Sequence, residues 1–323
     1  MVKATALAER ISNFGPTIDF YAPGLKRWQT QEWQPKNSRR FLPVSVTGNA
    51  CALQCDHCQA KVLEGMVSVR MGQNLFTLAE QLKASGSEGL LVSGGSLVNG
   101  SVPLKRHLKY VRRIKEELGM KVVVHSGVVT PTTAEALANS GVDAVMLDII
   151  GADETIRDVY HLSLQASDFD RSLELLSDAN LRIIPHIVIG LHYGKLLGEW
   201  NALEMIKKHS IDTLILVILT PLIGTPMAHI PPPSLDDVVS FFHHARQNMA
   251  TSRINLGCAR PMGLEKLQID RAAVELGLNG IAYPAEGIIE YAKDLGLTPK
   301  LYEWCCSMSW AGTDDNLTQV ALS

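Results

Sequence analysis

Short apolar runs rich in β-branched residues alternate with amphipathic stretches along most of the chain. The apolar runs lie at 41–47, 89–93, 121–125, 143–149, 182–189, 213–219, 253–257 and 278–282. Most of them are followed by a stretch whose apolar residues repeat at helical spacing, as Leu173 and Leu176 do within 169–179. The pattern therefore predicts a series of strand–helix units.

The predicted strands are apolar almost throughout, as in Val142–Ile150 and Ile183–Ile189. Such strands are buried on both faces, which is typical of a parallel sheet covered by helices. Eight units predict an α/β fold, a (β/α)8 TIM-type barrel over residues 41–296. A partial barrel of six strands with additional elements is the alternative. Residues 1–40 are then an N-terminal extension, and residues 297–323 form a C-terminal tail.

The composition and charge of the chain do not indicate a particular class of partner. The chain has 323 residues, of which 46% are hydrophobic, and a net charge of −3. Neither a nucleic acid nor an anionic membrane is needed to balance this charge. No apolar run approaches the roughly 18–20 residues that span a bilayer, and the first residues lack the apolar segment of a signal peptide. We therefore expect a cytoplasmic protein with no nucleic-acid or membrane partner.

Three of the six cysteines lie together, in the loop that follows the first predicted strand. Cys51, Cys55 and Cys58 have the spacing C-x3-C-x2-C. Three thiolates can hold three irons of a 4Fe–4S cubane and leave the fourth iron open to another ligand. A zinc site with His57 as fourth ligand is the alternative, although a histidine between two ligating cysteines is poorly placed for a tetrahedral site. A loop that binds no metal is the remaining alternative.

This motif, in a loop after the first strand of a predicted β/α barrel, resembles that of the radical S-adenosylmethionine (SAM) superfamily. The resemblance implies that the amine and carboxylate of SAM bind the open iron. An electron, supplied by a reductant such as ferredoxin or flavodoxin, then cleaves SAM to a 5′-deoxyadenosyl radical that abstracts hydrogen. The superfamily usually has an aromatic residue before the third cysteine. Here His57 takes that place, and its ring can still pack near the cofactor adenine.

Function in such a barrel is expected at the carboxyl ends of the strands. Ser93, Gly94, Gly95 and Ser96 end the second predicted strand. Glycines allow a ligand to approach the backbone closely, and the resemblance implies that this segment contacts the SAM amine. The superfamily usually has glutamate where Ser96 stands. A simple turn is the alternative interpretation of the glycine pair.

Further candidate SAM contacts follow the next three strands. Asp148 is a carboxylate near the end of an apolar strand, which is costly unless it is paired or bound to a ligand. The resemblance implies that Asp148 accepts the SAM ribose hydroxyls, with a structural role as the alternative. His125 can contact the methionine carboxylate or the substrate, or it is a polar residue of the rim. The strand 182–189 resembles the adenine-contacting strand, so we expect Ile187 at the SAM site and leave His186 open between core and ligand.

The other three cysteines suggest a second site. Cys258 ends the seventh predicted strand, and Cys305 and Cys306 lie in a tail that can fold over the barrel. Together they can supply three ligands to a second 4Fe–4S cluster, with Ser307 or Ser309 as an oxygen ligand. Buried structural thiols and a redox-active pair are the alternatives.

The segment 221–226, Pro-Leu-Ile-Gly-Thr-Pro, resembles the P-x-x-G-T-P loop of biotin synthase and its relatives. Biotin synthase carries its auxiliary cysteines on inner strands, and ordinary lipoyl synthase carries them in an N-terminal motif. This chain has cysteines in neither place. The resemblance is therefore to the biotin synthase-related proteins that form the two-subunit lipoyl synthase.

That resemblance implies a sulfurtransferase that inserts sulfur at unactivated carbon of a protein-bound octanoyl chain. A lipoyl carrier protein or domain would be the substrate, and a second radical SAM subunit would be a partner. One alternative is another biotin synthase-like radical SAM enzyme, a mutase or a metallocofactor maturase, without sulfur donation. The other is a non-catalytic iron–sulfur protein that transfers electrons or serves as a scaffold.

Overall fold

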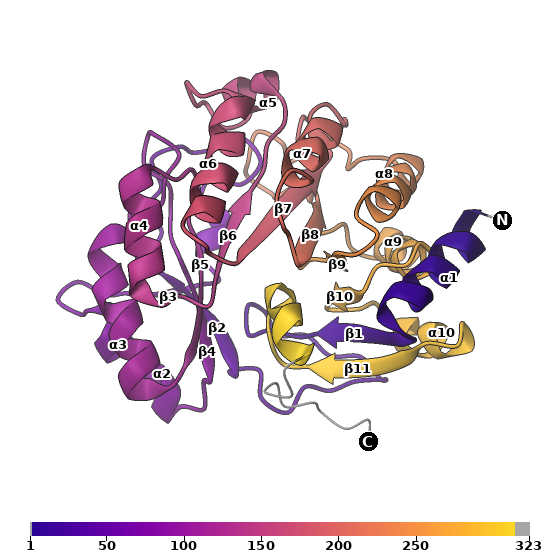
Figure 1. The fold of residues 1–323 in the computed structure, drawn as a ribbon, viewed down its shortest axis with the longest axis horizontal. Coiled ribbons are helices and arrows are strands. Elements are labelled where there is room, and N and C mark those ends of the chain that lie inside the picture. Colours follow the sequence, from indigo (N-terminus) through magenta and orange to yellow (C-terminus); the bar gives the residue numbers. More distant parts are fainter. Residues whose placement is uncertain (1, 314–323) are drawn as a thin grey trace.

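The computed structural model describes residues 2–313 and contains one curled parallel sheet of 11 strands (Figure 1). Its order is β11-β1-β10-β9-β8-β7-β6-β5-β4-β2-β3, and all neighbouring strands run parallel. The strands are β1 Thr17–Tyr21, β2 Phe41–Ser45, β3 Val67–Ser68, β4 Gly89–Ser93, β5 Lys121–His125, β6 Ala144–Asp148, β7 Ile183–Ile189, β8 Thr213–Ile218, β9 Arg253–Leu256, β10 Gly280–Ala282 and β11 Thr298–Tyr302.

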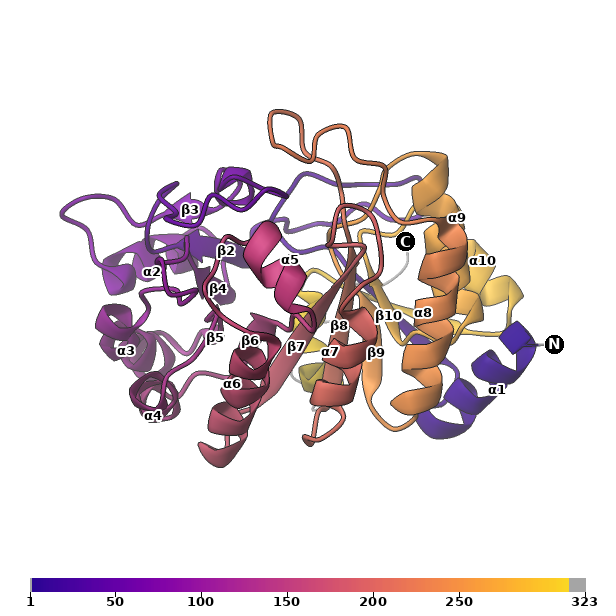
Figure 2. The ribbon, with the colours of Figure 1, turned by 90° about the horizontal axis from the view of Figure 1, so that it is seen from above.

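Helices cover the convex face of this sheet (Figures 1 and 2). They are α1 Val2–Phe14, α2 Leu75–Ala84, α3 Leu108–Leu118, α4 Pro131–Ser140, α5 Asp153–Asp158, α6 Ala166–Asp178, α7 Glu199–Ile206, α8 Leu235–Asn248, α9 Leu264–Glu275 and α10 Ile288–Asp294. The 3-10 helices η1 Lys61–Leu63 and η2 Lys105–His107 lie in the connections after β2 and β4, and η3 Cys306–Thr313 lies in the tail. None of the helices within residues 2–313 has the length and apolar character needed to cross a bilayer.

All eight predicted strands are present, but the prediction of a closed (β/α)8 barrel is wrong. The sheet is open, with β11 at one edge and β3 at the other. Three additional strands, β1, β3 and β11, account for the difference. β1 lies in the predicted N-terminal extension, and it pairs with both β10 and β11.

The missed strands lack the apolar pattern that marks the others. β1 contains Asp19, which is buried with an exposed fraction of 5% and pairs with Arg253 of β9. β11 contains Pro299 and Lys300, and proline is normally confined to sheet edges. β1 therefore has a buried ion pair, and β11 an edge position, in place of the continuous apolar run by which the other strands were predicted.

The C-terminal tail lies on the concave side of the sheet, where Figure 1 shows η3 in yellow. The Oγ1 atom of Thr213, at the start of β8, lies 3.0 Å from Ser309 Oγ, and Asn255 Nδ2 of β9 donates to Cys306 O at 2.9 Å. The expectation that the tail folds over the mouth is therefore wrong. Met308 has no exposed surface, because the open curl leaves an interior that apolar tail residues fill. Residues 314–323 of the predicted tail lie outside the described residues.

Candidate active site

The first three cysteines lie in the loop that follows β2. Cys55 and Cys58 are buried and Cys51 is half-buried. A hydrogen bond from Cys55 lowers the pKa of Cys58 to about 4, and the same bond together with burial raises the pKa of Cys55. Cys51 lies close enough to act on Cys55 electrostatically. Three soft sulfur donors at one place are the ligand set that an iron–sulfur cluster requires.

The described side chains give no support to a site for a single metal ion. No group of three or more histidine, cysteine, aspartate or glutamate side chains within them has the geometry to hold one ion. A cubane differs because each cysteine binds a different iron, so its ligands need not converge on one point. The donor set therefore fits a cluster better than the zinc alternative with His57.

Gly95 allows the cysteine loop to pack against the end of β4. A Cβ atom on Gly95 would lie 2.0 Å from Ala50 O and 2.6 Å from Cys51 Cα. Gly95 N donates to Thr47 Oγ1 at 2.7 Å, and Ala52 N donates to Ser96 O at 2.8 Å. The glycine thus has a packing role at the loop, and contact between residues 93–96 and the SAM amine stays a prediction.

Ser93 connects this segment to the next strand, because its Oγ donates to His125 O at 3.2 Å. Three polar side chains then follow, His125 and Asp148 at the ends of β5 and β6 and His186 in the middle of β7. His125 Nε2 lies 3.7 Å from Asp148 Oδ1, and the rings of His125 and His186 are 5.7 Å apart. Because Asp148 and His186 are register partners, their side chains share one face of the sheet.

The electrostatics of this group favour an ionised Asp148 beside a neutral His186. Burial alone would raise the pKa of Asp148, but His125 and His186 lower it to about 2. Burial, and then His125, lower the pKa of His186 to about 4. His186 Nδ1 lies 3.0 Å from Ile184 O. A carbonyl only accepts, so Nδ1 carries the proton and Nε2 is left as an acceptor. The group therefore presents acceptors to a ligand that bears hydroxyl or amino groups.

Ile187 follows His186 along β7, so its side chain points to the opposite face and is buried with an exposed fraction of 1%. Any contact of Ile187 with SAM would come from its backbone.

The ring of His57 packs against Tyr160 with centroids 5.2 Å apart. Among the described residues, the buried His57 Nδ1 has no hydrogen-bond partner, which leaves a polar atom for a ligand to satisfy.

Sequence reasoning missed the residues that fix the cysteine loop from outside. Asp56 Oδ1 lies 2.8 Å from His161 Nε2, and Tyr193 OH donates to Asp56 Oδ2 at 2.8 Å. The backbone N–H of Asp56 donates to Val159 O at 2.9 Å. Along the sequence, His161 is 105 residues from Asp56 and Tyr193 is 137 residues from it. No local sequence pattern could have identified such contacts.

The structure brings the second set of cysteines together. Cys306 forms hydrogen bonds with both Cys258 and Cys305, and Cys305 Sγ lies 3.5 Å from Ser307 Oγ. The bond with Cys306 lowers the pKa of Cys305 to about 7, and the bonds with Cys258 and Cys305 raise the pKa of Cys306. Ser309 bonds Thr213 instead and lies apart from this group.

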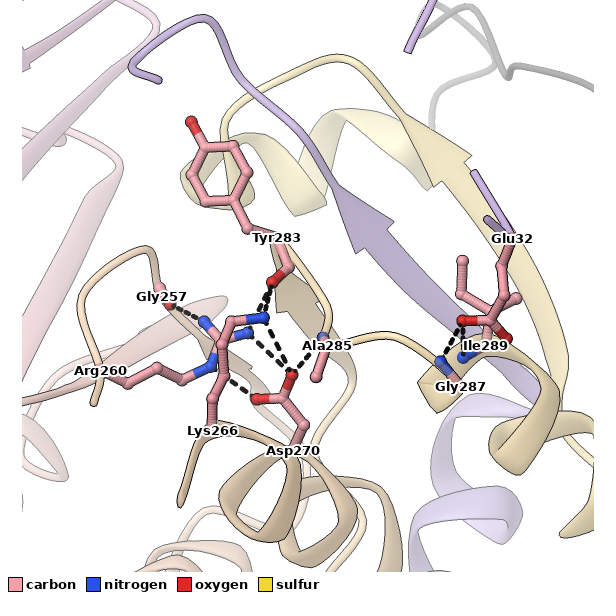
Figure 3. A network of polar contacts seen from close by, with 9 residues as sticks. All are labelled: Glu32, Gly257, Arg260, Lys266, Asp270, Tyr283, Ala285, Gly287 and Ile289. Atoms are coloured by element: carbon pink, nitrogen blue, oxygen red, sulfur yellow. Dashed lines mark hydrogen bonds and ion pairs between the residues drawn. The ribbon is translucent and has the colours of Figure 1, made fainter. Parts of the chain in front are cut away.

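A buried polar network fixes the loop that carries Cys258 (Figure 3). Arg260 makes two contacts with the Asp270 carboxylate, at 2.6 and 3.0 Å, and donates to Gly257 O and Tyr283 O, each at 2.9 Å. Lys266 Nζ donates to the same Tyr283 carbonyl at 2.5 Å, and burial lowers the pKa of Lys266 to about 8. Tyr283 has a φ of 49°, a conformation that costs free energy in a bulky residue and is held by these donors.

Comparison with known proteins agrees with this geometry. The family model described as the Radical SAM superfamily matches residues 45–206. A biotin synthase of Shigella boydii serotype 18 (strain CDC 3083-94 / BS512) is 24% identical over 288 residues, which cover 84% of this chain and 80% of that protein. A biotin synthase of Geotalea daltonii (strain DSM 22248 / JCM 15807 / FRC-32) is 24% identical over 242 residues, covering 70% and 69%.

Solved structures share the fold at lower identity. Methylornithine synthase is similar with a TM-score of 0.62 and 13% identity, covering 96% of this chain and 90% of that structure. The FeFe-hydrogenase maturase HydG from Carboxydothermus hydrogenoformans has a TM-score of 0.64 and 16% identity, covering 93% and 72%. At these identities the likeness concerns the fold alone.

Proposed function

The chain belongs to the radical SAM superfamily and is biotin synthase-like within it, and from this premise we propose that it inserts sulfur into a protein-bound octanoyl chain, as a lipoyl synthase does. The observation that carries the proposal is the contact of Cys306 with both Cys258 and Cys305. A sulfur-inserting enzyme needs a source of sulfur besides the cluster that binds SAM, because the open iron of that cluster is already occupied. A second 4Fe–4S cluster at these cysteines would meet this need.

The residues around the first cysteine set would then bind and orient SAM. When bound, the first cluster and SAM supply a radical that abstracts hydrogen, and the second cluster supplies sulfide. Asp148 accepts hydrogen bonds from the ribose hydroxyls. His186 Nε2 lies on the same face as a second fixed acceptor. The Asp56 contacts hold the cysteine loop in place while the substrate enters and leaves.

The second cysteine set has the burial that a sulfide donor requires. Cys305 and Cys306 have exposed fractions of 7% and 2%, and Ser307 has none. Burial protects a cluster from solvent and keeps its sulfide for the substrate. Because the sheet is parallel, the loops after β2 and β9, which carry Cys51, Cys55, Cys58 and Cys258, leave the same end of the sheet.

The proposed reaction also requires partners. A lipoyl carrier protein or domain would present the octanoyl chain, a ferredoxin or flavodoxin would supply electrons, and a second radical SAM subunit would complete the enzyme. These partners are part of the proposal, and each can be tested by adding the purified protein to the anaerobic assay.

Anaerobic reconstitution with iron and sulfide quantitation tests the proposal. We expect about eight irons per chain, from the stoichiometry of two cubane clusters. The variant Cys51→Ala/Cys55→Ala/Cys58→Ala should retain about half of that iron, with the absorption of an iron–sulfur cluster. The reduced wild-type protein should release 5′-deoxyadenosine and methionine from SAM.

Two outcomes would contradict parts of this proposal. A triple variant that binds no iron would remove the sulfur source, and a mutase or a metallocofactor maturase would then be the better assignment. A reduced wild-type protein that does not cleave SAM would instead favour the non-catalytic iron–sulfur protein.

A further inference from the structure

The exposed apolar side chains are gathered at one edge of the molecule. In the described part of the chain, every large hydrophobic residue that is exposed follows the carboxyl end of a strand, in a loop, in the short helix η1 or at the first residue of the next α-helix. These residues are Val62, Met71, Leu97, Val98, Leu197, Ile223, Leu235, Met262 and Leu264. Scattered exposed apolar residues are normal, but their collection at one edge indicates a contact surface.

Part of this edge forms a continuous surface, which we call the mouth patch and define by Lys26, Arg27, Lys61, Val62, Ile223 and Met262. Ile223, Met262 and Val62 have exposed fractions of 92%, 67% and 55%. Lys61 Nζ would lie 3.3 Å from a Cβ atom on Gly224, so η1 adjoins the loop after β8. Figure 2 shows that loop projecting beyond the strand ends.

The segment that carries Lys26 joins the other loops of the patch. Leu25 lies within 3.8 Å of the Cβ position of Gly65, next to η1. Lys26 Nζ lies 4.5 Å from the centre of the Tyr283 ring and interacts electrostatically with Cys258 and Arg260, in the loop of Met262. The mouth patch therefore bridges the loop of the first cysteine set and the loop of the second.

The patch has the opposite charge sign to the whole chain. Outside the buried pair of Arg260 with Asp270, residues 22–28, 59–66, 219–233 and 257–264 contain three basic residues, Lys26, Arg27 and Lys61, and one acidic residue, Glu64, whereas the chain has a net charge of −3. Arg27 and Lys61 make no ion pair with any described residue. Positive side chains interspersed with exposed apolar ones favour an acidic protein surface over a neutral or basic one.

We propose that the mouth patch is the docking surface for an acidic protein domain that carries the acyl chain on a lysine. The inference rests on the proposed function and specifies how its substrate is recognised. A free small substrate gains nothing from apolar side chains on the outer rim. A carrier domain uses them, and from this surface its lysine arm enters between the two cysteine sets.

A direct measurement of binding tests the proposal and does not require catalytic turnover. The probe is an acidic lipoyl domain bearing octanoyl-lysine, titrated onto the full reconstituted chain without SAM. We expect Arg27→Glu/Lys61→Glu to weaken binding by about tenfold or more, since like charges at an interface repel. We also expect Ile223→Ser to weaken it and added salt to weaken the wild type. Uncoupled SAM cleavage and circular dichroism report whether each variant is folded and loaded.

Matched variants outside the patch are the controls. Lys109→Glu changes an exposed cation on α3, and Lys83→Glu changes an exposed cation in the last turn of α2. Equal affinity in the patch variants and the wild type would overturn the proposal, as would equal losses in the controls. So would a domain that does not bind while a short octanoyl-lysine peptide is converted, an outcome that leaves the proposed function standing. Ile223→Ser breaking a dimer of this chain would assign the patch to a second copy instead.

Discussion

At Gly95 the chain has no room for a side chain, and this sets the position of the first cysteine loop. The atoms that a Cβ would meet are Ala50 O and the Cα and Cβ atoms of Cys51, which no side-chain rotation can move away. We expect Gly95→Ala to displace Cys51 and to lower iron binding by the first set and SAM cleavage, measured by iron quantitation and 5′-deoxyadenosine release. Gly65→Ala is the control, because its Cβ would meet Leu25 at 3.6 Å, an ordinary contact. Full cluster content in Gly95→Ala would show that the loop tolerates the shift.

Asp148 gives a second test at a single residue. Its carboxylate is ionised beside His125 and retains 33% exposure, so it is accessible to a ligand. Asp148→Asn removes the charge at nearly constant shape. Each charge-assisted hydrogen bond to the ribose should then cost roughly 1.5–3 kcal/mol of SAM binding free energy at most. Titration of SAM into the reconstituted protein measures this loss. Asp212→Asn, at an exposed ion pair with Arg182, should leave affinity unchanged; equal affinity in both variants would give Asp148 a structural role.

At the level of single residues, the cysteine spacing and the carboxylate at a strand end could be predicted from the sequence. Three cysteines within eight residues are a local signal, and so is Asp148 at the end of an apolar run. The partners of Asp56 and the proton position on His186 could not be predicted. They depend on which distant loops meet, and that is determined by the tertiary fold.

Among the ion pairs of the described residues, the pair of Arg260 and Asp270, which joins the loop after β9 to α9, is the most deeply buried. Arg260 and Asp270 have side-chain exposures of 1% and 0%. Removing one charge leaves the other buried without compensation, so Asp270→Asn should destabilise the protein by about 3–5 kcal/mol. Denaturant unfolding of the reconstituted protein measures the change. Glu117→Gln removes a pair with exposures of 47% and 48%, and should change the free energy of unfolding far less, because solvent screens an exposed pair. Similar effects of the two variants would contradict the importance of burial here.

The elements themselves were largely predictable, because a doubly buried parallel strand has a strong apolar signature. β5 and β7, with Val122–Val124 and Ile183–Ile189, are examples. β1 and β11 escaped prediction since each has a charged residue, Asp19 or Lys300, in the middle of the strand, whereas the charges of β5, β6 and β9 stand at a strand end. β3 escaped prediction since it has only two residues. β1 pairs with β10 and β3 pairs with β2, so β2 and β10, the two outermost predicted strands, do not pair with each other and the sheet is open.

In the molecule as a whole, the open sheet and the buried tail belong together, because the tail fills the interior of the sheet. The interior that a closed barrel would fill with its own side chains is filled here by residues 304–310, which carry Cys305 and Cys306 to Cys258. The tail is thus both part of the core and part of the second cysteine site. The sequence predicted which cysteines belong together but not that they meet inside the sheet.

This arrangement predicts that hydrogen abstraction and sulfur transfer can be separated. The variant Cys258→Ala/Cys305→Ala/Cys306→Ala keeps the first cysteine loop, which has its own anchors at Gly95 and Asp56. We therefore expect it to cleave SAM in the presence of an octanoyl-lysine domain and to form no carbon–sulfur bond, as measured by mass spectrometry of the domain. Ser309→Ala, in the same buried helix but bonded to Thr213, should transfer sulfur normally. Sulfur transfer by the triple variant would place the sulfur source elsewhere, whereas loss of SAM cleavage in it would mean that the tail supports the fold of the first site.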